Sequence, residues 1–210
     1  MFIEVLPEDV PSYLETISRS GILASFYMAG GTGLALQLGH RRSVDLDFFT
    51  KRPFDPSETA KKISYIGNFS IESKSQGTLH GLFHNVKLSL FHYSYSLLKN
   101  LHPFMGLQIA DAIDIGCMKI DAISSRGYMR DFIDLYVICN EVVSLKELLV
   151  FFEKKYKGVS YNKVHIMKSL IYFEEAEQEP LPKMLKKIEW NDVKTFFIDH
   201  VKTDMNKLLK

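Results

Sequence analysis

The sequence has little of several features that mark particular classes of protein. It contains two cysteines, Cys117 and Cys139, and both lie in apolar, helix-like patterns, which predicts reduced buried thiols instead of a disulfide framework. No apolar run approaches the roughly 18 residues that span a bilayer. The N-terminal MFIEVLPEDV lacks the charged start and apolar stretch of a secretory signal. We therefore expect a globular, cytoplasmic protein with no membrane role.

Strong net charge is also absent, since the formal charge of the 210-residue chain is +1. A net charge this close to zero argues neither for nor against nucleic-acid binding. The basic residues are unevenly distributed along the chain. All six arginines precede residue 131, and every Lys or Arg position after that is a lysine. Arginine's planar fork of donors suits phosphate, and four of the six lie beside the two motifs described below. The alternative is that they are ordinary solvated surface arginines.

Hydrophobic periodicity predicts two kinds of organisation along the chain. In the first half, strands are expected at 25–29, 43–49, 68–75, 78–84 and 86–93, with helices at 8–20, 31–38 and 56–66. Hairpin turns are expected at 76–77 and 84–85, and Asp55 is expected to cap the helix that begins at Pro56. Beyond a loop at Pro103 the pattern is helical, at 112–125, 130–142, 145–156, 161–175 and 190–208. The prediction is an α+β fold, a mixed sheet with helices followed by a helical bundle.

Two aspartates alternate with apolar residues in the segment SVDLDFF. On a strand, Val44, Leu46 and Phe48 would face a core, while Asp45 and Asp47 would face the other side. Carboxylates this close repel each other unless a cation or a proton lies between them, so the spacing favours a divalent cation. The alternative is a pair of solvent-facing aspartates on an edge strand.

A glycine turn precedes this segment. Gly30, Gly31 and Thr32 open a short helix, whose N-terminal N–H groups form a ready site for a polyphosphate. Together with Mg²⁺ at Asp45 and Asp47, this arrangement fits phosphoryl or nucleotidyl transfer. Neither the Walker loop nor the dinucleotide-binding fingerprint occurs in the chain.

The run GGTGLAL followed by HRRSVDLDFF resembles the first motif of the DNA polymerase β-like nucleotidyltransferase superfamily. More narrowly, it resembles the AbiEii/AbiGii toxin family. The segment IADAIDIGCMKIDAISSRGYMRDFIDLYVI, at 109–138, is similar to a second block of that family. The resemblance implies a nucleotidyltransferase core with a mixed sheet over 1–108. It also implies a helical part over 109–210, which would complete the active site and form a C-terminal bundle.

The resemblance implies a toxin of a bacterial toxin–antitoxin or abortive-infection system. Such an enzyme would use Mg²⁺ or Mn²⁺ to transfer a nucleoside monophosphate from an NTP to RNA, with tRNA as the first candidate, or to a protein. A cognate antitoxin would be a further partner. Two alternatives remain open: an inactive nucleotide-binding module that acts through a partner, and a small-molecule nucleotidyltransferase of the aminoglycoside type.

The resemblance also implies roles for individual residues. Gly30, Gly31 and Thr32 would hold the triphosphate, and Asp45 and Asp47 would bind the metal. In the second block, Lys119 would contact the phosphates, with Asp131 or Asp134 completing the site. Further nucleotide-binding candidates are Arg42, Ser43, Lys87, Arg126 and Arg130.

The second block has structural interpretations of its own. A single helix over 119–130 would place Lys119, Arg126 and Arg130 on one face, although Gly127 offers a break. Asp131 also reads as the N-cap of a new helix, and Lys119 as a surface lysine.

Polymerase-type nucleotidyltransferases usually carry a third carboxylate on a later strand. In NVKLSLFHY the inward candidates are Lys87 and Ser89, and neither is an acid. Three alternatives follow. Another residue serves as the base that deprotonates the acceptor hydroxyl, or the acceptor's proton leaves to solvent, or nucleotidyl transfer is slow or absent. Lys87 would instead be free to contact phosphate. His80 and His84 do not supply a shared metal site, because their spacing on a strand places them about 13 Å apart.

Overall fold

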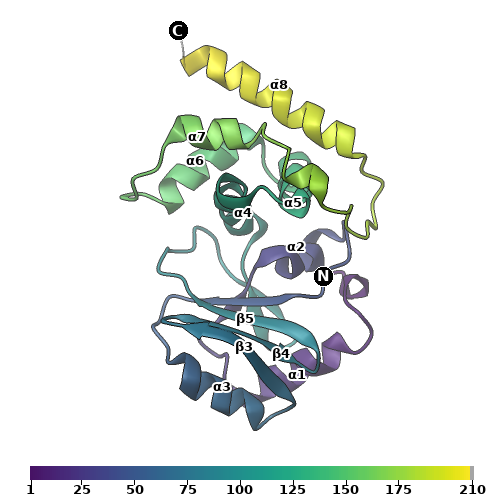
Figure 1. Ribbon diagram of the computed structural model, residues 1–210, viewed down its shortest axis with the longest axis vertical. Helices are drawn as coiled ribbons and strands as arrows, with labels where there is room; N and C mark the ends of the chain where they lie inside the picture. Colours follow the sequence, from purple (N-terminus) through teal and green to yellow (C-terminus); the bar gives the residue numbers. More distant parts are fainter. Residues whose placement is uncertain (209–210) are drawn as a thin grey trace. The chain divides into compact units, whose positions relative to one another are not determined.

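A mixed seven-stranded sheet organises the N-terminal part of the chain in the computed structural model, with strand order β3-β4-β5-β2-β1-β7-β6 (Figure 1). Its strands are β1 Tyr27–Met28, β2 Leu46–Thr50, β3 Phe69–Ser75, β4 Thr78–Phe83, β5 Val86–His92, β6 His102–Phe104 and β7 Leu107–Ile109. The helices of this part are the 3₁₀ turn η1 Ile3–Val5, α1 Val10–Ser20, α2 Gly30–Leu38 and α3 Pro56–Ser64.

The structure describes residues 1–208, with side chains as far as 203. The chain divides into two compact units, Met1–Asp111 and Ala112–Lys210. The last two residues of the predicted helical part, 209 and 210, lie outside the described residues. Nowhere in 1–208 does a helix combine the length and hydrophobicity needed to cross a bilayer.

Strand β2 lies near the middle of the sheet, parallel to β5 and antiparallel to β1. Its inner face is fully buried at Leu46 and Phe48, as the alternating pattern predicts. The expectation for Val44 is wrong, because the strand begins only at Leu46 and the Val44 residue is 39% exposed. Asp45 therefore immediately precedes the strand, whereas Asp47 lies within it.

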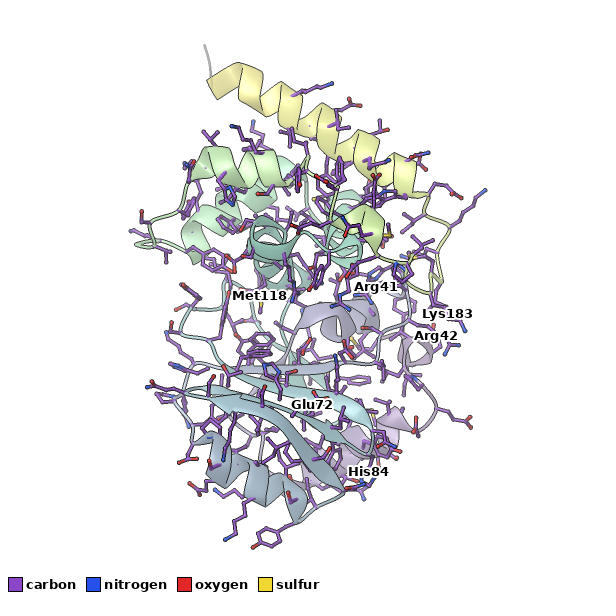
Figure 2. The ribbon with its side chains drawn as sticks, viewed as in Figure 1. Arg41, Arg42, Glu72, His84, Met118 and Lys183 are labelled. Carbon is purple, nitrogen blue, oxygen red and sulfur yellow. The ribbon has the colours of Figure 1, made fainter. Side chains whose placement is uncertain are left out.

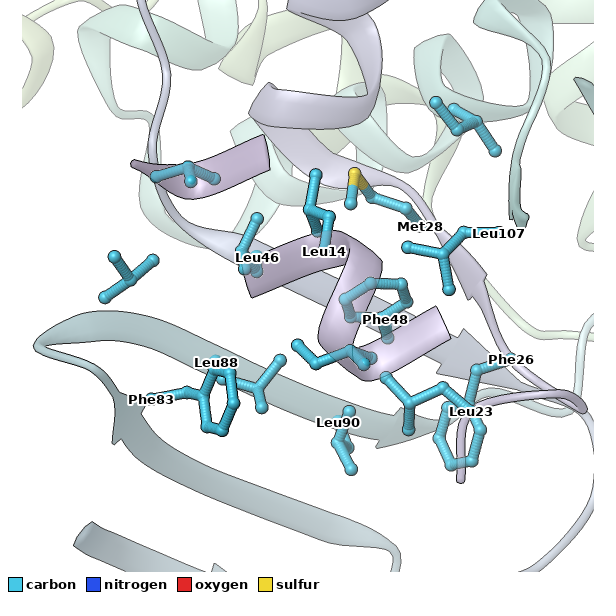
Figure 3. Packing of buried hydrophobic residues seen from close by; sticks show 14 of the residues in the cluster. Leu14, Leu23, Phe26, Met28, Leu46, Phe48, Phe83, Leu88, Leu90 and Leu107 are labelled. Carbon is cyan, nitrogen blue, oxygen red and sulfur yellow. The ribbon is translucent and has the colours of Figure 1, made fainter. Parts of the chain in front are cut away.

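The buried face of the sheet packs against α1 and α3, which lie on the same side of it (Figure 1). Figure 3 shows Leu14 of α1 among Leu46 and Phe48 of β2 and Leu88 of β5. Because the core occupies this face, the opposite face of β2 and β5 is left to polar and aromatic side chains.

The structure confirms the cap and hairpin turns that the sequence predicts. Asp55 caps α3, accepting hydrogen bonds from the backbone N–H groups of Ser57 and Glu58 at 2.7 and 2.9 Å. The β4–β5 hairpin turns at His84 and Asn85, which both have positive φ, as a two-residue type I′ turn requires.

The loop expected at Pro103 contains two short strands that the sequence pattern does not predict, before the helices begin at Ala112. His102–Phe104 and Leu107–Ile109 form an antiparallel hairpin, and Met28 of β1 pairs in parallel with Ile109. The turn is made by Met105 and Gly106, which both have positive φ. Strands of three residues are too short for alternation to reveal them.

The second unit is helical. Its elements are α4 Ala112–Arg126, α5 Met129–Glu141, α6 Leu145–Lys155, α7 Lys163–Ser169, the 3₁₀ turn η2 Ala176–Gln178 and α8 Trp190–Leu208. Helix α7 is much shorter than the predicted 161–175. Gly127, with φ of 54°, separates α4 from α5, so Lys119 and Arg130 do not share a helix. The mixed sheet followed by helices confirms the predicted α+β class.

Candidate functional site

Helix α2 begins at a glycine turn that lies against the carboxylate of Asp47. Gly30 has a φ of 64°, a conformation that side chains disfavour. A Cβ at this position would lie only 2.7 Å from Asp47 Oδ2. Glycine is therefore required both for the backbone conformation and for the close approach. The contact brings an acidic oxygen to the positive end of a helix, which is the type of position that binds phosphate with its counter-cation.

Thr32 fixes the segment that leads into β2. Its hydroxyl donates to the backbone oxygen of Asp45 at 2.5 Å and lies 2.9 Å from Ser43 Oγ. The backbone N–H of Ala29 donates to the carbonyl of Asp47 at 3.0 Å. Thr32 is 1% exposed, so its hydroxyl is committed to holding this segment. The glycine turn and the two aspartates are thus tied into one rigid arrangement.

An arginine that the sequence analysis did not select lies beside the glycine turn. Arg41 is 4% exposed and donates from Nη1 to the backbone oxygen of Arg42 at 3.1 Å. A Cβ at Gly31 would overlap Nη2 of Arg41. Arg42, the predicted nucleotide contact, is exposed (Figure 2). The adjacent arginines gave no signal for choosing between them, because burial is set by the tertiary fold.

Asp45 and Asp47 are both partly exposed, and they are the candidate metal ligands. Within the part of the chain whose side chains are described, no group of three or more histidines, cysteines or acids is placed to hold a metal ion. Mg²⁺ nevertheless binds commonly through one or two carboxylates, completed by substrate phosphates and water. The aspartate pair beside a glycine turn at a helix N-terminus therefore fits a metal that arrives with a triphosphate.

The polar face of the sheet continues from β2 into β5 and β4. Asp47 is the register partner of Ser89, and Ser89 is the register partner of His80. The Oγ of Ser89 lies 3.1 Å from Nδ1 of His80. Lys87, two residues before Ser89, is exposed. Ser89 therefore holds the strand position next to Asp47, where an acid is absent.

An aromatic row runs beside this polar row. Tyr27, Phe49 and Phe91 are register partners across β1, β2 and β5, with ring centroids 6.1 and 4.9 Å apart. The edge of Phe91 meets the imidazole of His80 at 5.3 Å, with the ring planes 74° apart. The row limits the space on one side of His80.

In the second unit, the predicted site residues form a buried ionic cluster. Lys119 Nζ lies 2.6 Å from an oxygen of Asp131 and 2.6 Å from an oxygen of Asp134. Arg126, half exposed, adds a bond from Nε to Asp131 at 3.2 Å. The surface interpretation of Lys119 is wrong, because its side chain is 7% exposed. The capping interpretation of Asp131 is also wrong, because α5 follows Tyr128 and has no side-chain cap.

Arg126 and Arg130 meet at one aromatic ring. Their guanidinium carbons lie 4.9 and 5.2 Å from the ring centroid of Tyr128, which occupies the break between α4 and α5. The break removes the predicted single-helix stripe, yet the two arginines still converge. Arginines around an accessible aromatic ring are suited to phosphate and to base stacking.

A second buried ion pair was not foreseen. Lys155 of α6 lies 2.6 Å from Asp114 of α4, and both side chains are fully buried. Lys155 lies outside both motifs, and Asp114 lies in the second block without an assigned role. Their separation of 41 residues gives no local pattern. Only the packing of α4 against α6 brings them together.

Neither cysteine is suited to act as a nucleophile. Burial raises the pKa of both Cys117 and Cys139 to about 12, with Lys155 opposing the rise at Cys117. We expect both thiols to stay protonated and to react with a maleimide at neutral pH only after denaturation. Mass spectrometry of native and unfolded protein measures this. Rapid labelling of the native protein would contradict it.

Comparisons with known proteins agree with this geometry. A model of the family described as "Nucleotidyl transferase AbiEii toxin, Type IV TA system" matches residues 12–80, which contain the glycine turn and both aspartates. The chain is 39% identical over 196 residues to the uncharacterized protein aq_aa25 of Aquifex aeolicus (strain VF5). That alignment covers 90% of this chain and 92% of the relative.

Two solved structures share the fold. A Helicobacter pylori protein assigned as a nucleotidyltransferase superposes with a TM-score of 0.53 at 15% identity, covering 95% of this chain and 96% of that one. MenT4, the nucleotidyltransferase toxin Rv2826c of Mycobacterium tuberculosis H37Rv, gives a TM-score of 0.52 at 12% identity, with coverages of 91% and 84%. These likenesses confirm the predicted nucleotidyltransferase-type architecture.

Proposed function

Because the chain belongs to the AbiEii nucleotidyltransferase toxin family of type IV toxin–antitoxin systems, we propose that it transfers a nucleoside monophosphate from an NTP to RNA, with tRNA as the first acceptor to test. The observation that carries this proposal is the contact between Asp47 and Gly30 at the start of α2. Transfer requires a carboxylate-held cation beside a phosphate cradle, and this contact brings the two elements together.

Within the first unit, each group has a distinct task. Asp45 and Asp47 would hold Mg²⁺ or Mn²⁺, which neutralises phosphate charge when bound. The N–H groups of Gly30 and Gly31 bind triphosphate oxygens at the positive end of α2. Arg41, packed against Gly31, supplies a fixed positive charge at the same turn. Catalysis then rests on positioning and charge neutralisation.

The second unit supports a nucleic-acid acceptor. Arg126 and Arg130 both flank Tyr128, and both arginines are exposed. Guanidinium groups contact the phosphate backbone, and their planes also stack on unpaired bases. This combination favours RNA over a protein acceptor or an aminoglycoside-type small molecule. A cognate antitoxin is the further partner that the family implies.

Transfer of label from α-³²P-NTP tests the proposal. Purified protein with Mg²⁺ or Mn²⁺ is expected to label RNA in a total RNA pool with at least one of the four nucleotides. Asp45→Ala is expected to abolish labelling. Glu15→Ala, which changes an exposed carboxylate on the core-facing helix α1, should label normally. Absence of labelling in RNA and lysate for all four nucleotides would overturn the proposal.

Ser89 beside Asp47 favours one second candidate, a nucleotide-binding module without transfer activity. Such a module would lack transfer because no acid is present at this position to accept the proton. Calorimetry distinguishes the two functions. Metal-dependent NTP binding without turnover, lost in Asp45→Ala, would support the module.

A further inference from the structure

The row Asp47–Ser89–His80 crosses three adjacent strands on the polar face of the first unit's sheet. The residues are register partners in β2, β5 and β4. Register partners in neighbouring strands have side chains on the same face, within reach of each other. The hydrogen bond of 3.1 Å between Ser89 Oγ and His80 Nδ1 joins the last two members. Whatever binds at Asp47 therefore has a serine beside it and an imidazole behind that serine.

A serine hydroxyl alone is too weak a base to accept a proton from an acceptor hydroxyl. Coupled to an imidazole it becomes competent, because its own proton passes to the ring nitrogen as the new proton arrives. The neutral tautomer with its proton on Nε2 leaves Nδ1 free to accept from Ser89. The ring of Phe91 packs against the imidazole in a T-shaped arrangement.

The strands around His80 carry both charged and polar groups. The charged groups on this part of the sheet are Asp47 beyond Ser89, Lys87 two residues before Ser89, and Glu72 at the bulge of β3. Ser73 is the partner of His80 on its other side. His80 is partly exposed, so the second nitrogen has a route to release the proton.

We propose that Ser89 and His80 together replace the missing third carboxylate, an inference that rests on the proposed function. The acceptor oxygen attacks the α-phosphorus of the NTP, and the bond from that phosphorus to the bridging oxygen breaks, releasing pyrophosphate. The acceptor's proton moves to Ser89 Oγ while the serine proton moves to His80 Nδ1. The imidazolium then loses one proton to solvent, and proton exchange with water restores the neutral tautomer with its proton on Nε2. Ser89 meets the acceptor, and His80 acts through Ser89 as a positioning residue.

The test compares three variants in the RNA-labelling assay. His80→Gln is expected to lower kcat about a hundredfold or more, with the KM for NTP unchanged. Ser89→Ala should behave in the same way. Ser89→Asp combined with His80→Gln restores a carboxylate, and is expected to recover at least tenfold over His80→Gln alone. Thermal melting and NTP binding establish that each variant is folded.

His92→Gln is the matched control. His92 is an exposed histidine of β5, three residues from Ser89 and on the opposite face of the strand, so wild-type kinetics are expected. A His80→Gln enzyme with kcat within threefold of wild type would overturn the inference. So would failure of the double variant to recover activity, or mass spectrometry showing the nucleotidyl group on Ser89 itself. An inactive wild-type enzyme, by contrast, would overturn the proposed function.

Discussion

Replacing Lys155 by methionine is expected to lower the free energy of unfolding of the second unit by about 3–5 kcal/mol. The substitution leaves the carboxylate of Asp114 fully buried without the ammonium group that lies 2.6 Å from it. The loss is measured by denaturant unfolding followed through the fluorescence of Trp190. This is the one tryptophan of the sequence, and it packs against Phe132 in the second unit.

The control removes both charges. Lys155→Met combined with Asp114→Leu removes both charges of this pair, and it is expected to recover most of the lost stability. Activity per folded molecule should remain near wild type in the double variant, since neither residue has an expected role in transfer. A single variant that loses less than about 1 kcal/mol would contradict the burial of an uncompensated charge.

Replacing Lys119 by methionine is expected to cost at least as much stability and, in addition, to abolish transfer. Two buried carboxylates, Asp131 and Asp134, each lie 2.6 Å from this ammonium group, and Arg126 adds a bond to Asp131. The resemblance to the toxin family separately implies that Lys119 contacts the nucleotide's phosphates. Stability is followed through Trp190 and transfer through RNA labelling.

A triple variant separates the two roles of Lys119. Lys119→Met with Asp131→Asn and Asp134→Asn removes the buried charges together, so folding should largely recover. If Lys119 or Asp131 acts in the reaction, transfer stays lost in this folded variant. If transfer recovers along with stability, the role of the cluster is only structural, which is to hold α4 against α5. Lys155→Met with Asp114→Leu is the matched control, because it also neutralises a buried ionic group.

The parts of the fold that were predictable depend on local signals. The glycine turn, the alternation around Asp47 and the cap at Asp55 each lie within a few residues, so their physics is readable in one short window. The Lys155–Asp114 pair and the burial of Arg41 are different. They depend on which helix or turn packs against another, and no window of the sequence contains that information.

The candidate site was predictable in the same uneven way. Asp45, Asp47 and the glycine turn follow from spacing, and the structure places Asp47 against Gly30. The absence of a third carboxylate can be seen in NVKLSLFHY, but the histidine that lies beside this position, His80, cannot. His80 becomes relevant only through the register of β4 on β5, which pairs it with Ser89. A strand register cannot be read from either strand alone.

The two-residue strand β1 has a consequence for the order in which the protein is assembled during synthesis. Met28 is paired on one side with β2 and on the other with Ile109 of β7. On the ribosome, β2 and β5 emerge and can pair early, but the far edge of β1 stays open until β7 has been made. Because closing so long a loop is slow relative to a hairpin, the pairing of β1 with β7 forms last. The nascent chain would therefore complete the centre of its sheet only once its first unit has been fully translated.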